Sequence, residues 1–217
     1  ITTSHKAIGF YYLLAGIFFG LVGWTLSQLI RMEVGFCGHI STRQSRVILE
    51  YNAIISSHGI VMLFAFVMPV GFSALGNCLL PLEQGVCELA YPRLNILSFW
   101  LFGIGTATYA LGALIQVGGL NAGWTFYPPL VTRDADALQT ATDLMILSMH
   151  ALGLSSAFGG INFLVTMRMY RHVCEDALGT SLYTWSITIM EMTSDGILVS
   201  GSLDNFIRIW DFLSGAC

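Results

Sequence analysis

Charged side chains are scarce in this chain of 217 residues. Asp, Glu, Lys and Arg make up 10% of it, whereas 55% is hydrophobic. An ordinary soluble domain carries about 25% charged residues, so the composition excludes a soluble domain with a full polar shell. Prolines are also few, at five, whereas there are 23 glycines. Many glycines and few prolines fit packed membrane helices, in which small residues let backbones approach closely.

Three kinds of pattern are missing. The basic residues form no patch, which argues against a nucleic-acid partner. The five cysteines show neither a C-x-x-C pair nor a zinc spacing, so we interpret them as isolated thiols that act as small hydrophobes. No cleavable signal peptide is recognisable, because the first apolar stretch is too long for a signal core.

Long apolar runs dominate what is present. A helix needs about 20 apolar residues to cross a bilayer. Four stretches meet this length: about 7–32, 51–82, 95–119 and 143–167. The sequence therefore predicts an all-α membrane protein with four transmembrane helices.

The end of the chain differs in character. Residues 182–190 resemble the start of a fifth span, but the acidic residues Glu191, Asp195 and Asp204 follow at once. Residues 195–215 alternate polar and apolar side chains with a strand period. We therefore expect a short, β-like extension after the start of a fifth helix.

Polar side chains inside spans are costly, so each is a functional candidate. His58, in the second span, is followed by Gly59, which leaves room for a flat and bulky group. A neutral imidazole there can ligate haem iron, or it can simply bond a neighbouring helix. His150, in the fourth span, carries the same two interpretations. Arg31 can snorkel to the headgroups or donate to a polar ligand substituent.

Uncharged polar residues also recur on three spans. They can form ordinary interhelical hydrogen bonds or line a hydrated proton path. Glu88, in the turn after the second span, can collect protons at the mouth of such a path, or can be a plain loop carboxylate. The uncharged residues are Asn77, Asn95, Ser155, Ser156 and Asn162.

Taken together, these segments resemble subunit I of cytochrome c oxidase. Agreement runs in the correct order over about residues 4–190, and so many independent motifs make it specific. The matching motifs are SHKAIG (4–9), IRMEVG (30–35), YNAIISSHGIVM (51–62), FSALGN (72–77), LPL (80–82), AYPRLN (90–95), SFW (98–100), GWTFYPPL (123–130), DL (143–144), SMH (148–150), SS (155–156), GINF (160–163) and LYTWS (182–186).

The resemblance implies a haem site. His58 matches one of the two axial ligands of haem a, and Arg31 matches the arginine that hydrogen-bonds the haem formyl group. Trp124 and Tyr127 match the loop packed near the haem propionates. Tyr51, which opens the motif of His58, is assigned to the same site. His150 matches a family histidine that is not a metal ligand.

The resemblance also implies a proton path and a cation site. Glu88 stands where the family has an aspartate at the entrance of the D channel, and is one methylene longer. Glu33 and Gly38 match part of a calcium or sodium site, although the sequence between them departs from the pattern. The residues that match positions along the D channel are Tyr12, Asn77, Asn95, Ser98, Ser155, Ser156 and Asn162.

Other departures bear on function. Cys78 replaces a tryptophan, and residues 36–47 are unfamiliar. The family's second haem a ligand, its haem a3 and copper B ligands and the end of its D channel all follow the start of the fifth helix. This chain is therefore not expected to reduce oxygen alone. A split subunit I needs a second chain that supplies the remainder; the other interpretation is a truncated record.

The expected partners are that chain, a dicopper subunit II, cytochrome c and membrane lipid, with nucleic acid excluded. The expected location is the mitochondrial inner membrane. One alternative is a quinol oxidase, with a bacterial plasma membrane as its location. Another is a non-catalytic membrane scaffold derived from an oxidase gene.

The tail resembles a different family. Residues 194–211, with the pair Trp210 and Asp211, are similar to one partial WD40 repeat. Such folds need several repeats to bury a core, so we expect no working propeller. The domain hypothesis is an oxidase-like unit over 1–190 and a tail over 191–217 that is not an independent domain.

Overall fold

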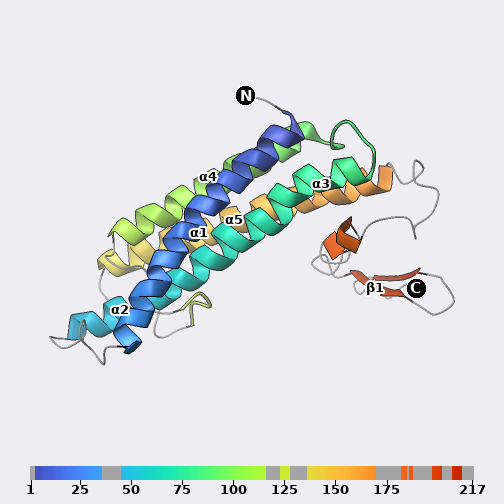
Figure 1. The fold of residues 1–217 in the computed structure, drawn as a ribbon. Coiled ribbons are helices and arrows are strands. Elements are labelled where there is room, and N and C mark those ends of the chain that lie inside the picture. Colours follow the sequence, from blue (N-terminus) through green and yellow to red (C-terminus); the bar gives the residue numbers. More distant parts are fainter. Residues whose placement is uncertain are drawn as a thin grey trace.

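The computed structural model describes residues 3–35, 45–115, 123–127, 136–169, 182–184, 186–187, 197–201 and 207–211. Four long helical rods lie side by side along most of the molecule (Figure 1). In chain order they are α1 (His5–Gly35), then the second rod built from α2 (Ser45–Ile60), η1 (Val61–Val67), η2 (Pro69–Ala74) and α3 (Leu75–Glu83), then α4 (Pro92–Ile115) and α5 (Asp136–Met169).

The four predicted spans are confirmed. Within the described ranges, four helices are long and apolar enough to cross a membrane: His5–Gly35, Tyr51–Glu83, Pro92–Ile115 and Thr140–Met169. Helix α2 begins at Ser45, six residues before its apolar span, because polar residues such as Arg46 and Glu50 can continue a helix beyond the bilayer.

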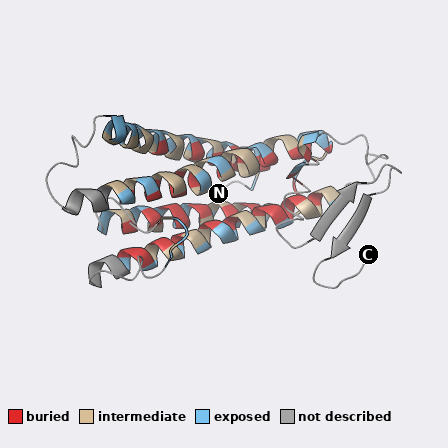
Figure 2. Ribbon diagram, turned by 90° about the horizontal axis from the view of Figure 1, so that it is seen from below, coloured by how far each residue is buried: buried red, intermediate tan, exposed pale blue. Residues whose placement is uncertain are grey.

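Neighbouring rods run antiparallel and approach closely at glycines. On α1, Gly16 faces Val70 and Gly23 faces Met62, so rising numbers on one rod meet falling numbers on the next. A Cβ on Gly105 of α4 would lie 2.9 Å from Cγ of Leu152 on α5. Figure 2 shows that the buried residues of the rods face one another and that the exposed ones face outward.

The second rod is not the plain α-helix that its apolar run suggests. Its middle is π-helical: the Met68 N–H donates to the Leu63 carbonyl, and the Leu75 N–H donates to the Val70 carbonyl. Pro69 opens η2 and has no N–H to donate. The i→i−4 ladder is therefore interrupted there, and wider turns replace it. Such turns are often found at functional sites.

The strand period in the tail is also confirmed. Strands β1 (Ile197–Gly201) and β2 (Ile207–Asp211) pair antiparallel, with Val199 opposite Ile209. Before them, the described residues 182–184 and 186–187 are helical. A fifth span and the domain boundary at residue 190 stay predictions.

Candidate functional site

His58 lies in the last turn of α2, where α1 passes beside it. Its Nδ1 is 2.9 Å from the Gly23 carbonyl oxygen of α1. A carbonyl oxygen only accepts, so Nδ1 carries the proton and donates it. In the neutral ring, Nε2 then keeps a free lone pair. Metal-binding histidines commonly show this pattern, in which the second nitrogen is held by a backbone carbonyl.

The backbone beside His58 is open. No heavy atom lies within 4 Å of a Cβ built on Gly59. His58 itself is half-buried. The space predicted from the sequence beside Gly59 is therefore present, and a flat group can approach His58 there. This part of the chain fits haem as the resemblance requires.

A short loop closes over the same end of the second rod. The Gly123 N–H donates to Ser56 Oγ at 3.0 Å, and Ser56 Oγ donates to the Asn52 carbonyl at 2.8 Å. Trp124 packs against Phe64, with their ring centroids 6.0 Å apart. The loop residues 123–127 are thus anchored within one turn of His58.

The two aromatic residues predicted for this loop remain accessible. Trp124 is 48% exposed and Tyr127 is 70% exposed. The turn is tight, because Gly123 and Phe126 both have positive φ, at 74° and 54°. Phe126 packs on the cluster that contains Ile60, so it fastens the turn and leaves its neighbours free to meet a ligand.

Among the described residues no hydrogen bond joins Tyr51 or Arg31 to His58, but helix geometry places both residues. Tyr51 precedes His58 by seven residues, which is about two turns on the same face of the helix. Arg31 follows Gly23 by eight residues, about 12 Å further along α1, and is exposed. Both therefore belong to the same end of the bundle as His58.

One carboxylate oxygen near this end is buried. Oε2 of Glu33 is shielded from solvent and has no hydrogen-bond partner among the described residues. Gly38, the second residue predicted for a cation site, lies outside the described residues. No three His, Cys, Asp or Glu side chains converge in the described part of the chain, so His58 is not part of a chelating set there.

A cluster of hydroxyls joins three rods in the core. Tyr12 OH lies 2.7 Å from Ser98 Oγ and 3.3 Å from Ser155 Oγ. Ser98 Oγ donates to the Ser155 carbonyl at 2.8 Å, and Ser155 Oγ donates to the Ser98 carbonyl at 2.7 Å. Both serine protons are thus used, which leaves Tyr12 to donate to Ser98. The structure brings these three predicted residues together.

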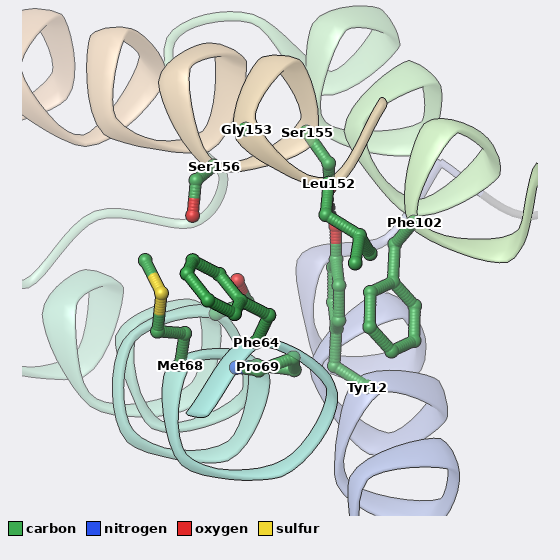
Figure 3. A pocket seen from close by; sticks show the side chains of 10 residues that line it. Tyr12, Phe64, Met68, Pro69, Phe102, Leu152, Gly153, Ser155 and Ser156 are labelled. Atoms are coloured by element: carbon green, nitrogen blue, oxygen red, sulfur yellow. Dashed lines mark hydrogen bonds between the residues drawn. The ribbon is translucent and has the colours of Figure 1, made fainter. Parts of the chain in front are cut away.

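A cavity of about 50 Å³ adjoins the cluster (Figure 3). One water needs roughly 10–15 Å³, so the cavity has room for at least one. Its lining is mostly apolar, but Tyr12, Ser73, Ser155 and Ser156 bring hydroxyl groups to it, and the Ser156 hydroxyl points toward Met68 and Phe64. Ser73 was not singled out in the sequence, because a serine in an apolar run carries no distinguishing signal.

The asparagines extend this polar region toward the other end of the bundle. Asn95 Nδ2 donates to Asn77 Oδ1 at 2.5 Å, and Asn77 Nδ2 donates to the Ser73 carbonyl at 2.7 Å. Ser73 therefore links the asparagine pair to the cavity. Oδ1 of Asn95 is buried with no partner among the described residues, and an unsatisfied buried acceptor of this kind commonly bonds an internal water.

Asn162 holds the turn that carries Glu88. Its Oδ1 accepts from the Tyr91 N–H at 2.9 Å, while its Nδ2 is buried without a partner among the described residues. Thr166 acts with it, since Thr166 Oγ1 accepts from the Ala90 N–H at 3.0 Å. Thr166 was missed in the sequence, where only its spacing of four residues from Asn162 suggests a shared helix face.

Glu88 itself meets the first residue of α1. His5 Nδ1 donates to Glu88 Oε2 at 2.9 Å, and the His5 backbone N–H lies 3.4 Å from the same oxygen. His5 is 3% exposed, whereas the Glu88 side chain is 46% exposed. The carboxylate thus caps the positive end of a helix and also reaches solvent. His5 appeared in the sequence only as one letter of a motif.

The chain matches the family model described as cytochrome c and quinol oxidase polypeptide I over residues 7–202. It is 37% identical over 191 residues to cytochrome c oxidase subunit 1 of Leishmania tarentolae, which covers 87% of this chain and 34% of that protein. The protein of the same name from Strigomonas oncopelti is 36% identical over 191 residues, covering 87% and 54%. That from Pecten maximus is 36% identical over 217 residues, covering 98% and 44%. The chain thus spans about a third to a half of these relatives' length.

Proposed function

Because the chain belongs to the cytochrome c and quinol oxidase polypeptide I family, we propose that it forms the N-terminal region of a cytochrome c oxidase subunit I. In the assembled enzyme it contributes one haem a ligand and most of a proton path to oxygen reduction coupled to proton pumping. The observation that carries the proposal is the hydrogen bond from His58 Nδ1 to Gly23, which leaves Nε2 free.

His58 would hold the iron of haem a through Nε2. Haem a, when bound, would supply one-electron transfer between the electron donor and the oxygen-reducing centre. The Gly23 carbonyl holds the imidazole ring in one orientation. Arg31 would donate to the formyl group, Trp124 and Tyr127 would cover the propionates, and Tyr51 lies on the face of α2 that carries His58. The rigid rods keep these groups in place.

Protons are collected by Glu88, which is partly exposed, and pass toward the cavity between the rods. Asn95, Asn77 and Ser73 form the hydrogen-bonded stretch that reaches the cavity. Beyond it, Tyr12, Ser98 and Ser155 form a cluster whose hydroxyls can each donate and accept. Ser156 supplies a further hydroxyl at the cavity wall, and Asn162 keeps the Glu88 turn in position.

The unpartnered Oε2 of Glu33 supports a cation site at the other end of α1. A buried carboxylate oxygen is costly unless a proton, a donor or a metal satisfies it, and oxygen ligands suit calcium. Glu33 and Gly38 are proposed as part of a calcium or sodium site.

The rest of subunit I supplies the remaining helices, with haem a3, copper B and the second ligand of haem a. A dicopper subunit II and cytochrome c are the proposed partners on the electron side, in the mitochondrial inner membrane. Quinol oxidase is the alternative, because the family name covers both donors. A dicopper subunit in the purified complex would favour cytochrome c.

The test is a reduced-minus-oxidised spectrum of the complex purified with this chain. We expect a haem a band that is lost in His58→Ala, because no other described residue replaces Nε2. His150→Gln is the matched control, since it changes a span histidine on another rod and should leave the band intact. A band that survives His58→Ala, or no haem a band at all, would contradict the proposal.

A further inference from the structure

One backbone carbonyl in the π-helical middle of the second rod has no donor at the position where its helix should supply one. The Met68 N–H donates to the Leu63 carbonyl, five residues back. In this register the next carbonyl, that of Phe64, expects its donor at residue 69. That residue is Pro69, which has no N–H. The Phe64 carbonyl is therefore left free by the proline.

This carbonyl lies at the wall of the cavity between the rods. Phe64 and Pro69 both line the cavity and lie beside each other there (Figure 3). A helix carbonyl points along the axis toward the residue that should donate to it, so the Phe64 oxygen points toward the Pro69 ring. A buried carbonyl without a donor is costly, and a donor from the cavity would satisfy it.

Two hydroxyl groups reach the same cavity. The Ser156 hydroxyl points toward Met68 and Phe64 from the opposite wall (Figure 3), and Ser73 lines the cavity from the second rod. A buried water commonly makes about three hydrogen bonds. One water in this cavity has three polar groups within its walls: the Phe64 carbonyl and the hydroxyls of Ser73 and Ser156.

A second carbonyl of the π-helical stretch already bonds a group from outside its helix. The Gly71 carbonyl of η2 accepts from Tyr183 OH at 3.0 Å. The interrupted ladder of this stretch thus offers backbone oxygens to donors that a regular α-helix would exclude.

We propose that Pro69 is a positioning residue of the proton path, and this proposal rests on the path proposed above. Because Pro69 withholds an N–H, the Phe64 carbonyl stays open to a cavity water. The water donates one hydrogen to this carbonyl, which fixes its orientation. Its oxygen accepts from Ser73, and its other hydrogen is directed to Ser156. Protons then cross the cavity from the asparagine side to α5.

The test is Pro69→Ala in the full complex, because alanine supplies the missing N–H and occupies the Phe64 carbonyl. Proton uptake during turnover, followed with a pH dye, should slow about 3- to 10-fold, the effect expected of one hydrogen bond. The haem a band should be unchanged. The unfolding temperature should be unchanged or higher, since a backbone hydrogen bond is added. A kink with only a structural role would leave uptake unchanged, which would overturn the proposal.

The matched control changes a single atom. Lactic acid at position 69 has the side chain of alanine but an ester oxygen in place of the N–H, so it leaves the Phe64 carbonyl free. It should restore most of the uptake rate. Equal slowing with alanine and with lactic acid would assign the effect to the lost ring and would overturn the proposal. Pro92→Ala, at the first residue of α4 where no carbonyl awaits a donor, should leave uptake unchanged.

The water itself is measured by infrared difference spectroscopy in ordinary water and in water enriched in oxygen-18. We expect an isotope-sensitive O–H band in the unsubstituted complex and in the lactic acid variant, and its loss in Pro69→Ala. Lactic acid in place of Ala65 turns the Phe64 carbonyl into an ester carbonyl, which is a weaker acceptor, and should shift the band. This second variant decides the question if Pro69→Ala fails to assemble. A band unaffected by these changes would overturn the proposal.

Failure of this proposal and failure of the proton path give different results. Normal uptake in Pro69→Ala with slow uptake in Tyr12→Phe would overturn the role of Pro69 and leave the path in place. Normal uptake in both variants would overturn the path as well.

Discussion

Two histidines of this chain look alike in the sequence and differ in their surroundings. His58 and His150 each donate Nδ1 to a backbone carbonyl, but the acceptor for His58 lies on another rod, at Gly23, and that for His150 lies one turn back in its own helix. Packing between rods thus fixes the orientation of His58. His150 is oriented only by its own helix.

Gly59 permits a direct test of the space beside His58. In Gly59→Leu the new side chain meets no protein atom within 4 Å of its Cβ, so the fold should be retained while the room for haem is filled. We expect the haem a band to fall at least tenfold, with the helical circular dichroism unchanged. Gly71→Leu, at an equally open glycine of the same span, should keep the band. A normal band in Gly59→Leu would show that haem lies elsewhere.

Tyr12→Phe removes one hydroxyl from the core cluster and leaves the reciprocal pair Ser98 and Ser155 intact. If Tyr12 relays protons, proton uptake during turnover should slow about tenfold while the haem spectrum stays normal. Stopped-flow uptake with a pH dye measures this rate. The neighbour Tyr11 is 45% exposed, and Tyr11→Phe should leave uptake unchanged. Equal rates in both variants would reduce Tyr12 to a packing role.

Glu88 caps α1, and a single substitution separates this cap from the proton collection that we propose for it. Glu88→Gln keeps an oxygen that can accept from His5 and so preserves most of the helix cap, but removes the charge that attracts protons. We expect proton uptake to slow by about tenfold or more, with thermal stability changed by no more than about 1 kcal/mol. Glu88→Asp, which is one methylene shorter, should retain part of the uptake. Unimpaired uptake in Glu88→Gln would leave Glu88 as a cap alone.

At the scale of the elements, the bundle is held by close contacts at a few glycines rather than by apolar burial against water. Lipid is as apolar as leucine, so helices in a membrane associate through packing and hydrogen bonds. Ser148 Oγ donates to the Gly105 carbonyl at 2.7 Å, where α4 and α5 approach closely. The polar residues of the proposed proton path lie at similar contacts, which explains why they can be buried.

Gly105→Ala tests that contact. Its Cβ would lie 2.9 Å from Leu152 Cγ and 3.2 Å from the Leu152 backbone nitrogen. Because the backbone cannot yield cheaply, we expect a loss of about 1–3 kcal/mol. Thermal unfolding of the complex in detergent measures it. Gly103→Ala, on the open side of the same helix, should leave the stability unchanged. Equal losses of stability in both variants would show that the contact with Leu152 does not cause the loss.

At the scale of the whole molecule, the chain spans about a third to a half of the length of its relatives, so the proposed activity needs the rest of subunit I. Mass spectrometry of the purified complex should therefore find peptides from further apolar spans that carry the remaining histidine ligands. It should also detect peptides from 191–217. A complex that lacks those spans would contradict the proposed function, though not the family.

Much of this protein could be predicted from its sequence. The length and apolarity of the spans determined the four rods, because a bilayer leaves few other ways to satisfy a backbone. The motifs around His58, Glu88 and Tyr12 determined the family and the candidate residues. The alternating pattern of 195–215 likewise predicted β1 and β2, since a period of two suits only a strand.

Contacts between distant segments were decided only by the tertiary structure. No local pattern shows that the Gly23 carbonyl holds His58, that His5 meets Glu88, or that Ser73 joins the asparagines to the cavity. The π-helical middle of the second rod could not be predicted from local sequence either. Pro69 removes a hydrogen-bond donor, but the neighbouring rods determine how the chain accommodates the loss. The length of an apolar span can be read from the sequence one residue at a time. Hydrogen bonds between membrane helices depend instead on which residues the packing brings within about 3 Å of one another.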